Sequence, residues 1–404
     1  MARTANPAGG RRPATAKRAF SILVVLIGVG TAIGLIVLWP GDVNAPVSEG
    51  LAADTERAEV DSVTYEACPP PQTGQCGEAE ISLQTGPDAG ETTTLIVGGT
   101  ELEPELEPGD QVRVARSEPP LVAPSDPSRD LPASPGAEPT ASASDASYTL
   151  TDFERRTPML WLAIAFAVLV IAFGRFRGAL SLLGLGISLV VILTFVVPAL
   201  LDGSPALAVA IVGSLAVMLV TISLAHGWGP KSLAAMLGTA VSLALVALLA
   251  LAFTNLTQLT GLSSEEATIL FRGGAGISLE GLLLAGIVIA ALGVLDDVTV
   301  SQASTVLALR SANPALGVRE LFGRALRVGQ DHVSATVNTL VLAYVGASLP
   351  VLLIFSSGEL GLTDALNTEL IAKEVVGTLV GSIGLIAAVP VTTALAALLA
   401  PEPP

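Results

Sequence analysis

Apolar residues gather in eight blocks along this chain, and one long polar segment, residues 41–157, separates the first block from the rest. A helix that crosses a bilayer needs about 20 apolar residues. The pattern therefore predicts an α-helical polytopic membrane protein with eight spans. Two blocks are short, so flanking residues must extend them. The blocks are Ala19–Trp39, Pro158–Phe173, Ala179–Leu201, Pro205–Ala225, Ser232–Phe253, Gly281–Leu295, Val333–Phe355 and Val375–Ala400.

The first block follows a basic tail, residues 1–18, that contains Arg11, Arg12, Lys17 and Arg18. A cleaved signal peptide has an apolar core of about 7–15 residues. This block, 19–39, is longer, which predicts an uncleaved signal anchor. The alternative is a signal peptide that is cleaved after Ala45.

Composition supports the membrane class. Only 14% of the residues are charged and the mean hydropathy is +0.68, whereas soluble domains carry about 25% charged residues. The net charge of −16 and an aromatic content of 4% argue against a nucleic-acid partner. The lipid bilayer is the expected partner.

Charge also predicts the orientation. Residues 41–157 carry 23 acidic and 6 basic residues. Leaving the long segment 41–150 out of the count, a cytosolic N-terminus places 12 basic residues in cytosolic segments and 4 on the other side of the membrane. Cytosolic loops of membrane proteins are enriched in Lys and Arg. We therefore expect a multi-pass protein of the cell membrane with both termini inside and 41–157 extracytoplasmic.

The outer segment alternates short β-type runs with turns. Ala79–Leu83, Thr92–Val97 and Val112–Ala115 are candidate strands, and residues 41–118 are expected to form a small β-rich domain, barrel-like or OB-like, of about five strands. Residues 119–147 are rich in Pro, Ser and Ala and are expected to be a disordered linker. Residues 148–157 supply a final strand that leads to a seven-helix bundle, 158–404.

The only two cysteines, Cys68 and Cys76, lie in this outer segment. The expected compartment is oxidising, so a disulfide is predicted. Zinc is the alternative, but it needs four ligands, and the segment contains no histidine. No metal site is therefore expected.

The chemistry of the membrane half is concentrated between residues 281 and 355. Asp297, Ser301 and Ser304 share one helix face, and Asp296 precedes them. Either the two aspartates lie inside the bilayer, where ionisable groups are functional candidates, or the span ends at Leu295 and the aspartates cap a cytosolic helix.

A second polar face contains Asp331, Ser334 and Asn338, with His332 beside it. Such residues also serve as interhelical contacts. Asn313-Pro314 predicts the start of a short amphipathic helix on the cytosolic membrane surface between the two polar faces. The two faces are predicted to meet inside the bundle, since each relieves the other's cost of burial.

Several short segments carry a family pattern: Asp152–Arg156 leading into Leu160–Leu162, Gly174–Gly178, Leu295–Val298, Gly329–Asp331 and Asn338–Tyr344. In these segments the chain resembles the YibE/F-like integral membrane proteins. The similarity covers about 148–356 well and the outer domain loosely. Two features depart from the family: a second acid at Asp296, and the linker 119–147. The resemblance implies a signal anchor, a small outer β domain and a multi-span bundle, but no established activity.

Three function hypotheses follow. The first is a transporter or permease for a cation or a proton-coupled solute, with Asp296, Asp297, Ser301, Asp331, His332 and Asn338 as candidate site residues. The second is a scaffold or sensor whose outer domain binds a partner protein, or which forms a homo-oligomer. The third is an intramembrane aspartyl enzyme, which is disfavoured because a Gly-x-Gly-Asp setting is missing. No enzymatic activity and no cofactor are expected.

Overall fold

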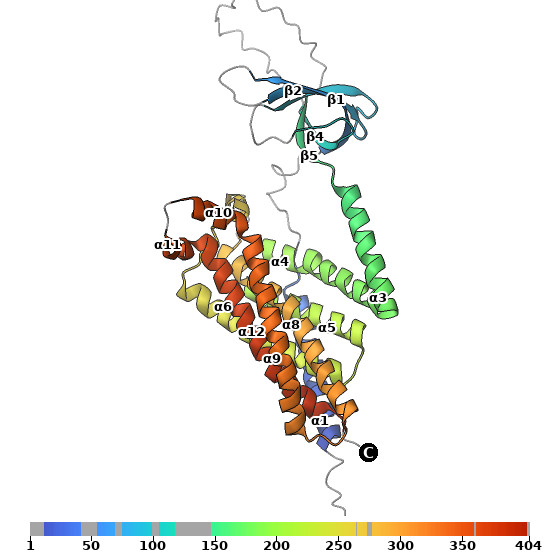
Figure 1. Ribbon diagram of the computed structural model, residues 1–404, viewed down its shortest axis with the longest axis vertical. Coiled ribbons are helices and arrows are strands. Elements are labelled where there is room, and N and C mark those ends of the chain that lie inside the picture. Colours follow the sequence, from blue (N-terminus) through green and yellow to red (C-terminus); the bar gives the residue numbers. More distant parts are fainter. Residues whose placement is uncertain are drawn as a thin grey trace, which may run out of the picture. The chain divides into compact units, whose positions relative to one another are not determined.

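The computed structural model describes residues 12–41, 55–68, 75–98, 105–117, 147–263, 265–272, 277–358 and 361–401. The chain divides into two compact units (Figure 1). Met1–Val47 and Ala167–Pro404 form a helical bundle, and Ser48–Phe166 contains the β domain. Of the tail expected at 1–18, residues 1–11 lie outside the described residues. Of the linker expected at 119–147, residues 119–146 lie outside them.

The β domain is one antiparallel sheet of five strands. β1 (Thr55–Ala67), β2 (Gln75–Leu83), β3 (Thr92–Gly98), β4 (Gln111–Ser117) and β5 (Ser147–Phe153) lie in the order β3-β2-β1-β4-β5. The ladder of β1 with β2 shifts register between Val60 and Ser62, and such a bulge increases twist. The sheet is a half-barrel, which agrees in part with the expected barrel-like or OB-like domain; it is open because the two edge strands, β3 and β5, do not pair in it.

Alternation along these strands creates the small core. Val60, Ile81, Leu95, Val112 and their period-two neighbours are buried, as expected for a sheet with one apolar face. Cys68, at the end of β1, forms a disulfide with Cys76 on β2. The predicted strands at 79–83, 92–97, 112–115 and 148–153 are all present.

Tyr148 links β5 to the turn between β2 and β3. Its hydroxyl donates to the Asp88 carboxylate at 2.6 Å, and Arg116 on β4 lies 3.2 Å from the same carboxylate. Burial and the hydrogen bond to Asp88 raise the pKa of the Tyr148 phenol. The contact holds the curled sheet together where no strand ladder does.

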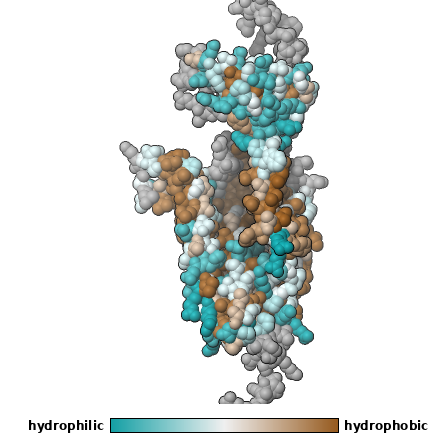
Figure 2. Space-filling model, turned by 45° about the vertical axis from the view of Figure 1, so that its right-hand side comes forward, coloured by the Kyte–Doolittle hydropathy of each residue, from teal (hydrophilic) through white to brown (hydrophobic). Residues whose placement is uncertain are grey.

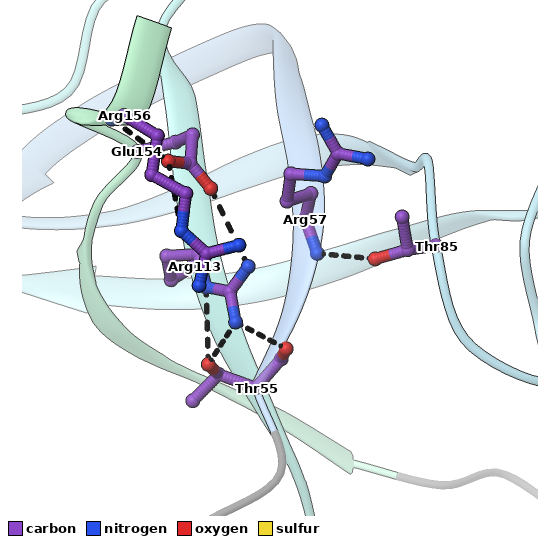
Figure 3. A network of polar contacts seen from close by, with 6 residues as sticks. All are labelled: Thr55, Arg57, Thr85, Arg113, Glu154 and Arg156. Carbon is purple, nitrogen blue, oxygen red and sulfur yellow. Dashed lines mark hydrogen bonds and ion pairs between the residues drawn. The ribbon is translucent and has the colours of Figure 1, made fainter. Parts of the chain in front are cut away.

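A second polar network fixes the junction between β5 and the helix that follows it, α3 (Arg156–Val191) (Figure 3). Arg113 on β4 donates to the Thr55 carbonyl at 2.7 Å and lies 3.4 Å from Glu154. Glu154 accepts the backbone N–H of Arg156 at 3.0 Å. This hydrogen bond, reinforced by the guanidinium groups of Arg156 and Arg113, holds the pKa of Glu154 below its ordinary value of 4.5. The start of the helix is therefore anchored on the β domain.

Among the described residues, six helices are long and apolar enough to cross a membrane, and the count is seven if a bent pair is one span. The pair is α9 (Val318–Ala347) and α10 (Leu349–Ser357), bent by 63°. The number of spans thus stays a prediction. The six ranges are Ala16–Val37, Arg156–Leu201, Ala206–His226, Pro230–Leu256, Leu279–Ala312 and Glu369–Leu399.

The 46-residue range is not one straight helix. It comprises α3 (Arg156–Val191), a π-helical turn (Ile192–Val196) and α4 (Val197–Leu201). The backbone at Arg175 is non-helical, with φ 51° and ψ −132°, so α3 bends there. The bend falls between the predicted blocks Pro158–Phe173 and Ala179–Leu201.

Three helices form the centre of the bundle: α6 (Pro230–Leu256), α8 (Leu279–Ala312) and α12 (Glu369–Leu399). α1 (Arg12–Val37), α5 (Ala206–His226) and α9 pack around them, while α7 (Glu265–Arg272) and α11 (Leu362–Asn367) are short. α6 and α12 approach closely at Gly238, where a Cβ atom would overlap the Thr392 hydroxyl. Brown, hydrophobic side chains gather on the helices, whereas the visible face of the β domain is largely hydrophilic (Figure 2).

The amphipathic segment differs from its prediction. It does not begin at Asn313-Pro314, which form a turn, but at Val318, and it continues without a break to Ala347 as α9. Leu321 and Ala325 are buried against the bundle, so this segment is the first part of a long helix and not a separate surface helix. The predicted faces themselves are correct, because Arg319, Arg324 and their charged neighbours are exposed.

Candidate functional site

α8 carries the two aspartates in the middle of a continuous helix. The helix starts at a Ser278 cap and ends at Ala312, so 16 residues follow Asp296. At 1.5 Å per residue, Asp296 lies about 26 Å along the helix from Leu279. The aspartates therefore do not cap a helix that starts after Leu295, whereas the predicted end of the span at Leu295 stays a prediction.

Asp296 points toward the neighbouring helices α5 and α6. Thr221 on α5 donates from its hydroxyl to Oδ2 of Asp296 at 3.1 Å. Thr299 donates to the Asp296 carbonyl at 3.2 Å, and the hydroxyls of Thr299 and Thr239 on α6 are 2.7 Å apart. The hydrogen bond from Thr221 orients the Asp296 carboxylate. The hydroxyl groups of Thr299 and Thr239 lie on the same side of the helix.

The other carboxylate oxygen has no such partner. Oδ1 of Asp296 is buried and forms no hydrogen bond to the described residues. An unpaired buried oxygen is costly, and more so when it is charged. Oδ1 is therefore available to a proton, a cation or a polar solute.

Asp296 lines a cavity of about 510 Å³ between α3, α5 and α8. Its wall on the α3 side includes the π-helical turn, a distortion that is frequent at functional sites. Most of the wall is apolar, with a few convergent polar groups, as in typical solute sites. The lining residues are Ser181, Gly184, Leu185, Ser188, Ile192, Val196, Gly213, Ser214, Val217, Thr221, Ile222, Ala225, His226, Ile289, Leu292, Gly293, Asp296, Asp297 and Val300.

Asp297 also lines the cavity, but its side chain is exposed. Successive residues of a helix differ by about 100° in direction, so the two aspartates point to different surroundings. The structure makes Asp296 the enclosed carboxylate and places Asp297 at the rim.

Besides His226, four further polar residues of the cavity were not predicted from the sequence. Ser181 and Ser188 lie on α3, and Ser214 and Thr221 on α5. Ser214 Oγ is buried without a partner among the described residues. Each pair is spaced by seven residues, which places both members on one helix face. That spacing, within otherwise apolar helices, is the signal that could have identified them.

The remaining predicted site residues lie elsewhere. Ser301 donates to the carbonyl of Val298 in its own helix, and it does not line the cavity. Asp331, His332 and Asn338 are exposed on α9 and are absent from the cavity wall.

The predicted meeting of the two polar faces is therefore wrong. α9 turns its small residues inward instead: at Gly329 a Cβ atom would lie 2.5 Å from Val389 and 2.8 Å from Oε1 of Gln302. Gln302 donates to Thr393 at 2.7 Å and to the Ala325 carbonyl at 3.0 Å. Close packing of α9 on α8 and α12 fixes its rotation and leaves the opposite, polar face outside.

No group of three or more His, Cys, Asp or Glu side chains is arranged to hold a metal ion in the part of the chain that the structure describes. The candidate site thus consists of one enclosed carboxylate, hydroxyl groups and an apolar wall.

Long apolar helices and a helical bundle define a polytopic membrane protein. The chain belongs to the YibE/F-like protein family, whose match covers residues 162–402 and therefore includes the whole cavity. Comparisons with curated proteins and with solved structures give no match.

Proposed function

We propose that this protein is a non-enzymatic transporter that carries a cation or a proton-coupled solute across the cell membrane. The observation that supports this proposal is the unpartnered Oδ1 of Asp296 in the wall of the 510 Å³ cavity. A carboxylate inside a membrane helix costs about 2.5–3.5 kcal/mol on insertion scales, and such residues commonly mark ion and proton pathways. If position 296 only had to pack against the neighbouring helices, an apolar residue would do so without this cost.

The proposed topology has eight spans. A straight helix of 46 residues would be about 69 Å long, more than twice the hydrocarbon thickness, so the bend at Arg175 divides this range into two crossings. With α9 and α10 as one span, the count is eight. The first turns of α1 and the end of α12 lie at the same end of the bundle (Figure 1), which fits an even number. The basic residues favour that end as cytosolic, with residues 41–157 outside.

One wall of the cavity is suited to movement. α3 contains only two buried residues, Gly178 and Gly184, whereas α8 and α12 are packed along most of their length. Elements with few buried contacts open at the lowest free energy. Movement of α3 would expose Asp296 to one side of the membrane at a time.

Ion flux into proteoliposomes tests the proposal. Vesicles that contain the full chain and an enclosed pH dye are given gradients of Na⁺, K⁺, Mg²⁺, Ca²⁺ or inorganic phosphate in turn. We expect at least one gradient to change the internal pH with the wild type but not with Asp296→Asn. Absence of a response under all gradients, or an equal response of the variant, would overturn it.

A scaffold or sensor is the second candidate. The network of Arg113, Thr55 and Glu154 ties the β domain to the start of α3 (Figure 3), which would transmit a binding event from the outer domain to a membrane helix. Absence of flux in the proteoliposomes, together with a protein that binds the β domain, would favour this function.

A further inference from the structure

A second cavity, of about 380 Å³, adjoins the first at Ser181, Ala225 and His226. Arg177 lines it from α3, just after the bend, and Lys231 lines it from the start of α6. Three basic side chains from three helices therefore face one space. It lies at the end of the bundle that the proposed topology assigns to the cytosol.

Within the described part of the chain, no acidic group neutralises the positive charge of this cavity. Its described lining contains no Asp or Glu, and neither Arg177 nor Lys231 belongs to an ion pair in the described part of the chain. The first turn of α6 has Gly229 as its N-cap, with no side-chain hydrogen bond, so its backbone N–H groups add to the positive potential. Arg177 and His226 are exposed at this cavity, so an anion can reach the basic groups, and a neighbouring opposite charge favours their charged forms.

The rest of the lining is apolar except for Ser181. Val170, Phe173 and Gly174 add an apolar part to the wall, and Phe173 is 96% exposed. A ligand that carries a phosphate next to a hydrocarbon chain fits such a wall better than a free ion does.

We propose that Arg177, His226 and Lys231 form a binding site for a phosphate-bearing anion at the mouth of the Asp296 cavity. The shared chemistry is a phosphate oxygen held by a guanidinium and an ammonium group. Its source is either the headgroup of an anionic phospholipid, for which basic pockets between membrane helices are a known type of site, or a soluble phosphate. The site does not depend on the proposed transport activity.

Ligand-dependent melting of the full chain in detergent tests the site, with native mass spectrometry to count bound lipids. The probes are dioleoylphosphatidylglycerol, dioleoylphosphatidylcholine and inorganic phosphate. We expect phosphatidylglycerol, but not phosphatidylcholine, to raise the melting temperature and to bind in a defined number. In Arg177→Gln/Lys231→Gln, affinity should fall about 25-fold, because each basic residue contributes about fivefold.

The matched control is Arg319→Gln/Arg327→Gln, which removes two exposed charges from the same end of the bundle. It should bind phosphatidylglycerol as the wild type does. Stabilisation by inorganic phosphate alone, lost in the first double variant, would also support the site and assign it to a soluble anion. Equal binding of both phospholipids by the wild type, or equal loss in the control, would overturn it. If the double variant does not fold, the single variants Arg177→Gln and Arg177→Lys test the site. Arg177→Gln should lose phosphatidylglycerol binding, whereas Arg177→Lys, which keeps the charge, should retain it.

Discussion

Asp296 and Asp297 differ by one position and by their surroundings. The sequence indicated the pair, because no other charge lies between Glu280 and Arg310, but it favoured Asp297, which shares a helix face with Ser301 and Ser304. The structure encloses Asp296 instead, since α5 and α6 present Thr221 and Thr239 on that side. The spacing of residues in the sequence predicts which side chains share a polar helix face. Which neighbouring helix that face contacts depends on the packing of the bundle.

Thr221 positions the carboxylate, and its hydroxyl should matter for transport. Thr221→Val keeps the side-chain volume and removes the donor to Asp296. A hydrogen bond to a charged group contributes about 1.5–3 kcal/mol, so the initial rate of ion flux in proteoliposomes should fall about tenfold or more. Thr221→Ser, which keeps the hydroxyl, is the control, and a rate in Thr221→Val equal to that of the control would contradict this role.

Glu154 makes the junction of the β domain with α3 sensitive to acid. Its folded-state pKa is lowered, so its stabilising contribution is present above the unfolded value of 4.5 and is lost as the pH falls through the folded value. Glu154→Gln should therefore exchange amide hydrogens of β4 and β5 faster than the wild type at pH 7.

At lower pH the difference between the two proteins should shrink, because the wild-type carboxylate becomes protonated. Hydrogen exchange measured by mass spectrometry at several pH values between 7 and 4 checks this. Glu107→Gln, a change at an exposed residue outside the network, is the control. A difference that grows as the pH falls would show that the sign is wrong.

At the scale of elements, the apolar blocks predicted most helices but not their ends. Gly281–Leu295 ends at a charge, yet α8 continues to Ala312 because Asp296 finds donors within the bundle. α9 joins a predicted surface helix to a predicted span, since no proline interrupts Val318–Ala347. Its rotation could not be predicted, because contacts such as Gly329 against Val389 decide it.

The contact of α6 with α12 predicts a strong effect of a small change. Gly238→Ala places a Cβ atom against the Thr392 hydroxyl and 3.1 Å from the Thr392 Cβ. Overpacking of this kind costs about 1–3 kcal/mol, so the melting temperature in detergent should fall. Gly346→Ala on α9, where nothing lies within 4 Å, is the control and should not be destabilised. Equal melting temperatures of the two variants would contradict the close contact.

At the scale of the whole molecule, the sequence predicted the class, the family and the small β domain. It also predicted the Cys68–Cys76 disulfide, which the structure contains. The cavity could not be predicted, because its walls come from α3, α5 and α8, and their approach depends on long-range packing rather than on any single segment.

The topology can be tested with thiol labelling in intact cells. The two native cysteines are joined, so an introduced cysteine supplies the reactive thiol. Ser142→Cys, in the outer segment, should react with a membrane-impermeant maleimide, whereas Ser311→Cys, next to the end of α8, should react only after permeabilisation. Labelling of Ser311→Cys in intact cells would contradict the orientation.

The central claim is that the Asp296 carboxyl in the cavity moves protons or cations. The most direct measurement compares flux through the wild type, Asp296→Asn and Asp331→Asn in proteoliposomes of equal protein content under the gradient to which the wild type responds. Asp331 carries the same charge change but lies on the exposed face of α9, away from the cavity. The account predicts that Asp296→Asn abolishes flux and Asp331→Asn preserves it. Equal flux through both variants, or loss only in Asp331→Asn, would contradict it.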